Sequence, residues 1–94
     1  MFLGKRIKEL REERHLLQRQ LAASLEIDTP MYSKIERGER KAKREQVIKL
    51  AELLGTSIDE LLTLWLAGQV YEIIKEEESA PKALQLVAQT LTNK

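Results

Sequence analysis

Apolar residues recur along this chain three or four positions apart, which is the spacing of one face of an α-helix. Leu3, Ile7 and Leu10 predict a first helix over residues 3–14. Further helices are predicted through five sets of in-phase residues: Leu21, Ala22 and Leu25; Tyr32 and Ile35; Val47, Leu50, Ala51 and Leu54; Ile58, Leu61, Leu62, Trp65, Leu66, Val70, Ile73 and Ile74; and Leu84, Val87, Ala88 and Leu91. The chain is therefore expected to be all-α, with five helices and a C-terminal helical extension.

Polar, proline and glycine residues mark where these helices begin and end. Asp28 is a suitable N-cap for the third helix, and Pro30 is tolerated in its first turn. Gly38 and Gly55 suit the ends of the third and fourth helices. Ser57 can cap the fifth helix.

The apolar stripe of the fifth helix is unusually long. It keeps helical phase from Ile58 to Ile74, and Gly68 falls off the stripe. A glycine inside a helix costs roughly 1 kcal/mol. The pattern therefore predicts either one continuous helix or a break at Gly68.

Length and composition limit the class of protein. With 94 residues, 43% of them hydrophobic and 33% charged, the chain can hold one soluble globular domain. It has no Cys, which excludes disulfides and thiolate metal sites. The charge at Lys5 interrupts any signal-peptide pattern, and no uncharged run is longer than residues 61–71, which are too few to span a membrane. We therefore expect a cytoplasmic protein.

Charge is divided unevenly along the chain. Residues 1–50 hold 13 Lys and Arg against 8 Asp and Glu, a net charge of +5, whereas residues 51–94 hold 3 against 7, a net charge of −4. The excess is greatest from Lys34 to Arg44, with six basic residues and two acidic ones. Because a phosphate responds to the local field, this segregation indicates a nucleic-acid partner that the net charge of +1 would not suggest.

Residues 16–38, LLQRQLAASLEIDTPMYSKIERG, predict two short helices joined by a tight bend. Helix pairs of this kind lay the second helix in the major groove of DNA. The segment therefore predicts recognition of a DNA sequence.

The first 62 or so residues resemble the lambda-repressor-like helix-turn-helix family of bacterial and phage regulators, the Xre or Cro/C1 type. Four stretches carry the resemblance, in family order and at family spacing: IKELREE, LLQRQLA, YSKIERGER and VIKLAELLGTSIDELL. The resemblance implies a five-helix DNA-binding domain over residues 1–64. It leaves residues 65–94 as an extension, which we expect to mediate dimerisation.

The resemblance also implies roles for residues at matching positions. Gln18 would hold a backbone phosphate, and Arg11 and Glu36 would form a structural salt bridge. The implied base contacts are Thr29, Pro30, Ser33 and Lys34. Lys34 suits guanine O6 and N7, with a phosphate contact as the alternative.

The basic residues that follow the third helix are expected to clamp the sugar-phosphate backbone. These are Arg37, Arg40, Lys41, Lys43 and Arg44. A solvated charge is the alternative for any one of them.

Three residues depart from the family pattern near the bends. Glu26 replaces the usual glycine between the second and third helices, where a left-handed backbone would cost about 1 kcal/mol. Leu17 replaces the Ser or Thr that caps the second helix, and His15 replaces a glycine. These departures bear on local stability rather than on the fold.

The extension carries more apolar surface than one small domain covers by itself. We expect two copies to bury it by pairing, as a homodimer on a palindromic or near-palindromic operator with two half-sites. The residues expected at this interface are Trp65, Leu66, Val70, Ile73, Ile74, Leu84, Val87 and Leu91. Folding of the extension back onto its own domain is the alternative.

No residue set predicts catalysis, a metal site or a cofactor. His15 is the only histidine and the chain has no Cys, so His15 cannot anchor a metal site or a catalytic triad. Glu76, Glu77 and Glu78 would point in different directions on a helix and so would not bind one cation together. We therefore expect a non-enzymatic transcription regulator, with restriction–modification controllers nearest in size and plan. An antitoxin or adaptor that binds a protein through the extension is the alternative, and non-specific nucleoid binding is a weaker one.

Overall fold

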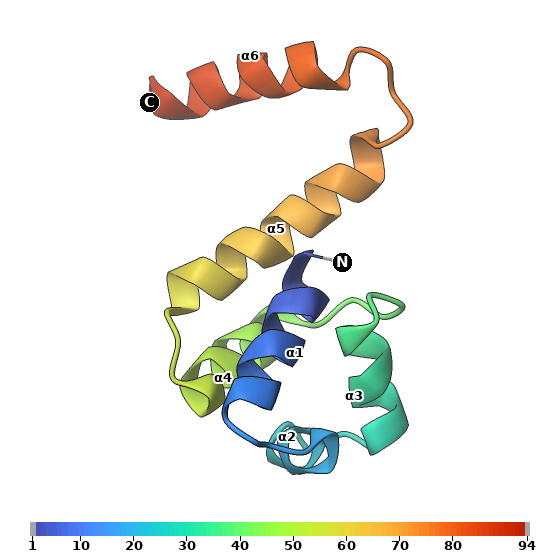
Figure 1. The fold of residues 1–94 in the computed structure, drawn as a ribbon. Coiled ribbons are helices and arrows are strands. Elements are labelled where there is room, and N and C mark those ends of the chain that lie inside the picture. The colour runs from blue at the N-terminus through green and yellow to red at the C-terminus, as the bar shows by residue number, and fades with distance from the viewer. Residues whose placement is uncertain (1, 94) are drawn as a thin grey trace.

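The computed structural model describes residues 2–93, which form six α-helices and no strand. The helices are α1 (Phe2–Glu13), α2 (Gln18–Ser24), α3 (Thr29–Glu36), α4 (Arg44–Leu54), α5 (Ile58–Ile74) and α6 (Ala80–Thr92). Figure 1 shows α1 to α4 and the start of α5 gathered in one bundle, with α6 held apart at the far end of α5. The predicted all-α class is confirmed. None of the helices within this range is both long and apolar enough to cross a membrane.

The core is made of the inward faces of α1 to α5. Because each of these helices carries apolar residues at helical spacing, one stripe from each meets at the centre of the bundle. Fully burying one large aliphatic side chain contributes about 1.5–3 kcal/mol. The buried apolar residues are Ile7, Leu10, Leu21, Ala22, Tyr32, Ile35, Ala42, Val47, Leu50, Ala51, Leu54 and Leu61.

Helix ends follow the predicted capping residues. Asp28 Oδ1 accepts a 2.8 Å hydrogen bond from the backbone N–H of Met31 at the start of α3. Ser57 Oγ accepts one of 3.2 Å from the backbone N–H of Glu60 at the start of α5. Gly55 ends α4 in the left-handed conformation, with φ of 64°.

The two bends around α2 place side-chain-bearing residues in the left-handed region. His15 has φ of 55° and Glu26 has φ of 60°, at the positions where the resemblance led us to expect glycine. Leu17 has no side-chain acceptor to cap α2. Gln20 compensates in part, because its Oε1 accepts a 2.7 Å hydrogen bond from the backbone N–H of Leu17.

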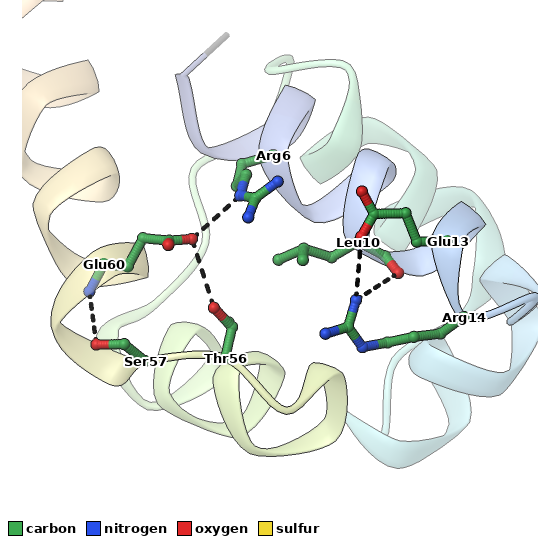
Figure 2. A network of polar contacts seen from close by, with 7 residues as sticks. All are labelled: Arg6, Leu10, Glu13, Arg14, Thr56, Ser57 and Glu60. Carbon is green, nitrogen blue, oxygen red and sulfur yellow. Dashed lines mark hydrogen bonds and ion pairs between the residues drawn. The ribbon is translucent and has the colours of Figure 1, made fainter.

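Polar contacts fasten the start of α5 to α1 (Figure 2). Arg6 Nε donates a 3.1 Å hydrogen bond to Glu60 Oε2, and Thr56 Oγ1 donates one of 3.4 Å to the same oxygen. Farther along, the Phe2 and Tyr71 rings meet edge to face with centroids 5.7 Å apart. These contacts hold α5 against α1 on both sides of Gly68.

The helix α5 is continuous through Gly68 over all 17 of its residues. Of the two predicted alternatives, the unbroken helix is therefore the observed one. The expected division between residues 64 and 65 falls inside this helix, so the bundle and the extension share one rigid element.

Within the extension, the start lies against the bundle through Trp65 and Tyr71, whereas α6 does not pack closely on it. The closely packed helix pairs within residues 2–93 are α1 with α3, α4 and α5, α2 with α3, and α4 with α5, and none of them includes α6. No residue of α6 is buried. The apolar face of α6 is therefore left uncovered by the rest of residues 2–93.

Candidate nucleic-acid interface

The helix α3 lies on an outer side of the bundle, next to α2 (Figure 1). Tyr32 and Ile35 turn inward and are buried. Thr29, Pro30 and Lys34 are exposed. The helix thus presents its first turn and Lys34 to solvent while its opposite face is fixed in the core.

Glu36, at the end of α3, is a buried anion surrounded by donors. Its Oε2 accepts a 2.7 Å hydrogen bond from Arg11 Nε, and its Oε1 accepts one of 3.1 Å from Arg11 Nη2 and one of 3.0 Å from Gln18 Nε2. The side chains of Arg11 and Glu36 are only 11% and 2% exposed. One carboxylate therefore joins α1, α2 and α3.

The pKa of Glu36 lies below its ordinary value. Burial by itself would raise this pKa, but the hydrogen bonds from Arg11 and Gln18 and the nearby Tyr32 hydroxyl outweigh it. The Tyr32 hydroxyl is buried near the carboxylate and has no hydrogen-bond partner of good geometry within residues 2–93. Glu36 is thus held as a carboxylate.

The same ion pair fixes the residues expected to touch DNA. Gln18, an expected phosphate contact, has its amide held by Glu36 beside the end of α3. Arg11 Nη1 also donates a 3.0 Å hydrogen bond to the carbonyl of Leu16, just before α2. The relative placement of α2 and α3 therefore depends on Glu36.

Arg37 is held by its neighbours on the exposed side of α3. Its Nε donates a 2.7 Å hydrogen bond to Glu39 Oε2, and its Nη1 donates to Ser33 Oγ. The hydrogen bond from Arg37, helped by its charge, lowers the pKa of Glu39. Ser33, expected to face a base, thus shares its hydroxyl with Arg37, whereas the Lys34 ammonium has no ion-pair partner within residues 2–93.

The basic segment between α3 and α4 lies against α5. Trp65 Nε1 donates a 2.8 Å hydrogen bond to the carbonyl of Ala42. Lys41 Nζ and Arg44 Cζ lie 5.7 Å and 5.1 Å from the centroid of the Trp65 ring. The five basic residues expected to contact phosphate are all exposed, whereas Gln18 is partly buried: the five are Arg37, Arg40, Lys41, Lys43 and Arg44.

The residues expected at a dimer interface divide into two groups. Trp65 and Ile74 are partly buried, and Trp65 packs against the core of its own chain. The remaining six are exposed: Leu66, Val70, Ile73, Leu84, Val87 and Leu91. Trp65 thus differs from the rest of the set, because its contacts are made within one chain.

Sequence reasoning missed the intramolecular role of Trp65. The signal was Ala42, the only apolar residue among the charged residues 39–44, which suggests a segment anchored at that point. Gln20 was also missed as the substitute cap of α2. A Gln three residues after the cap position is the available signal.

Comparisons with known proteins agree with this geometry. Residues 7–61, more than half of the chain, match the helix-turn-helix family model. The cryptic phage CTXphi transcriptional repressor RstR of Vibrio cholerae is 28% identical, over 97% of this chain and 88% of its own length. Control protein C.MunI of a Mycoplasma species is 34% identical, over 64% of this chain and 82% of its own length.

A third relative is the HTH-type transcriptional regulator DdrOP3 of Deinococcus deserti. It is 36% identical, and the match covers 66% of this chain and 48% of that protein. No solved structure gives a significant match. The family match covers α2 and α3, and α3 presents an outer face beside a run of cations. The chain belongs to the helix-turn-helix family, as a DNA-binding transcriptional regulator of the Xre/Cro-C1 type.

Proposed function

We propose that this regulator recognises a specific duplex sequence by laying α3 in the major groove. The observation that carries the proposal is the outer face of α3, where Thr29, Pro30 and Lys34 are exposed beside the basic segment 37–44. Lys34 donates to guanine O6 or N7, and Thr29 and Pro30 pack on a thymine methyl. Ser33, partly buried and bonded to Arg37, contacts a base from the next turn.

Phosphate contacts on either side of α3 fix its position in the groove. We assign them to Gln18 at one end and to the exposed cations at the other, which are Arg37, Arg40, Lys41, Lys43 and Arg44. The five cationic contacts predict that affinity falls by roughly 500-fold between 50 and 200 mM salt. An adaptor or antitoxin that binds only protein through the extension would show a flat response.

Selection of bound sites from random duplexes tests this recognition directly. A recurring motif is expected from the wild type. Lys34→Ala should relax the preference at one position of each half-site, whereas Lys82→Ala, an equal charge loss on α6, should leave the motif unchanged. Recovery of random sequence by the wild type would refute sequence-specific binding and favour non-specific nucleoid binding.

We further propose that the chain works as a homodimer on a palindromic operator. At about 1.5 Å per residue, the eight residues of α3 span about 12 Å and reach only a few base pairs. Useful affinity therefore needs two half-sites about one helical turn apart. The exposed apolar face of α5 and α6 supports pairing, since Ile73 is 78% exposed and Leu91 is 59% exposed.

Sedimentation of the intact protein at micromolar concentration tests the dimer. Two copies are expected for the wild type and for Gln85→Asp, a polar position on α6. Ile73→Asp puts a charge on the apolar face and should give a monomer in which the buried core stays folded. A wild-type monomer would refute the dimer.

The regulated genes are proposed from the relatives. The likeness to control protein C.MunI supports a controller, and we propose that it acts on restriction–modification genes. The likeness to RstR covers nearly the whole chain, extension included, and supports a repressor in phage lysogeny. Placing the selected operator upstream of a reporter, with and without this protein, distinguishes repression from activation.

A further inference from the structure

Trp65 is the only tryptophan of the chain and lies on α5, where the bundle gives way to the extension. Its indole packs against the core, and its Nε1–H donates to the carbonyl of Ala42. Ala42 is the only buried residue among residues 37–43 and is 2% exposed. The hydrogen bond therefore anchors an otherwise exposed basic segment at its middle.

Two cations that flank Ala42 lie over the same indole. Both Lys41 and Arg44 are within about 6 Å of the ring centroid, the range in which the negative face of an aromatic ring attracts a cation. Both residues remain exposed. A guanidinium stacked on a ring keeps its N–H edge available for a phosphate, so this placement orders the cations without hiding them.

Two further cations of the segment lie beside the same indole. Trp65 lines an open groove of about 810 Å³ together with Arg37, Arg40 and Lys41, and Glu39 and Glu72 line it too. Like charges brought this close repel one another, and an unanchored segment would spread them apart. One indole thus supplies a fixed point and a negative ring face to a cluster of positive charges.

We propose that Trp65 is a positioning residue for DNA binding, which holds residues 41–44 in the conformation that meets the phosphate backbone. The proposal rests on the proposed phosphate contacts of Lys41 and Arg44. Because the cations are ordered before DNA arrives, less side-chain and loop freedom is lost on binding. Trp65 itself touches no DNA.

Two substitutions separate the hydrogen bond from the ring. Trp65→Phe keeps a smaller ring and removes the N–H donor, and it should weaken operator binding by about threefold. Trp65→Leu removes both and should weaken binding by about tenfold. Its slope of log Kd against log salt should also shrink by about 1 to 2, because one or two phosphate contacts are lost.

A matched variant distinguishes positioning from general stability. Leu62 lies on α5 and packs, partly buried, against the same core. Leu62→Ala should lower the melting temperature but leave Kd and the salt slope at wild-type values, when measured well below melting. Trypsin gives a readout without DNA: cleavage after Arg40, Lys41 or Lys43 should be at least about threefold faster in Trp65→Leu than in Leu62→Ala.

The outcomes are distinct. If both Trp65 variants fold by circular dichroism yet keep wild-type Kd, salt slope and trypsin rate, Trp65 does not position the segment. If the wild type itself lacked salt-dependent duplex binding, the proposed function would fail, and the trypsin rates alone would still decide whether Trp65 anchors residues 41–44.

Discussion

Replacing Glu36 by glutamine keeps the volume of the side chain and removes the charge that Arg11 and Gln18 share. The amide group of the glutamine cannot accept both guanidinium hydrogen bonds, and one of its N–H bonds would face Arg11. Removing one partner of a buried ion pair leaves the other charge uncompensated. Glu36→Gln is therefore expected to destabilise the junction of α1, α2 and α3.

The size of the effect follows from burial. The Glu36 side chain is 2% exposed and that of Arg11 is 11% exposed, so solvent can do little to replace the lost contacts. Breaking a buried ion pair typically lowers the free energy of unfolding by about 3–5 kcal/mol. Because Arg11 keeps its hydrogen bond to the Leu16 carbonyl, we expect a loss at the lower end, about 3 kcal/mol. For a domain of this size the melting temperature should fall by roughly 12–24 °C.

Thermal and urea unfolding measure this loss, and Glu39→Gln is the matched control. Glu39 also accepts a 2.7 Å hydrogen bond from an arginine, but both partners are more than half exposed. Solvent screens such a pair, so its loss should barely move the melting temperature. If Glu36→Gln and Glu39→Gln lowered the melting temperature equally, burial would not explain the contribution of the Arg11–Glu36 pair to stability.

Three further predictions concern backbone and pH. Gly4→Ala should destabilise the fold by about 2 kcal/mol, because the added Cβ would overlap the Glu36 carbonyl oxygen and lie 2.9 Å from the Ile35 carbonyl oxygen. Gly68→Ala should stabilise it by up to about 1 kcal/mol, since the added Cβ has room in mid-helix, and urea unfolding of both variants checks the contrast. Glu26→Gly should stabilise by up to about 1 kcal/mol by relieving a left-handed conformation, and an equal gain from Glu26→Ala in the same assay would contradict that cause. Because the folded pKa of Glu36 is depressed, its contribution to stability is complete above the ordinary value of 4.5 and is lost as the pH falls through the folded pKa. Unfolding free energy should therefore fall less steeply below pH 4.5 in Glu36→Gln than in the wild type.

Local signals predicted the fold well. Asp28, Ser57 and Gly55 end or begin helices through contacts with residues at most four positions away, so the sequence alone contains both partners. The core stripes were predictable for the same reason. Continuity at Gly68 was not, because a cost of roughly 1 kcal/mol is decided by packing along the rest of α5.

The spacing of apolar residues does not predict contacts between segments that are far apart in the sequence. The stripe of α5 placed Trp65 among residues for a partner chain, yet its N–H reaches a carbonyl 23 positions earlier. The close approach of α1 and α3 at Gly4 likewise depends on how two helices cross. The exposed face of α3 was predictable, whereas the bond between Arg37 and Ser33 depends on side-chain rotamers.

Because α5 is continuous, its length and helical twist set the position of the extension relative to the DNA-binding bundle. Each residue of an α-helix adds about 1.5 Å and turns the chain by about 100°. In the homodimer that we propose, one residue inserted between Trp65 and Val70 would turn the second copy by about 100° around the helix axis and misalign the two recognition helices on the proposed operator. Four inserted residues turn the helix by about 400°, slightly more than one full turn, and would nearly restore that alignment at a longer spacing. In the proposed dimer, the length of α5 therefore sets the distance between the half-sites.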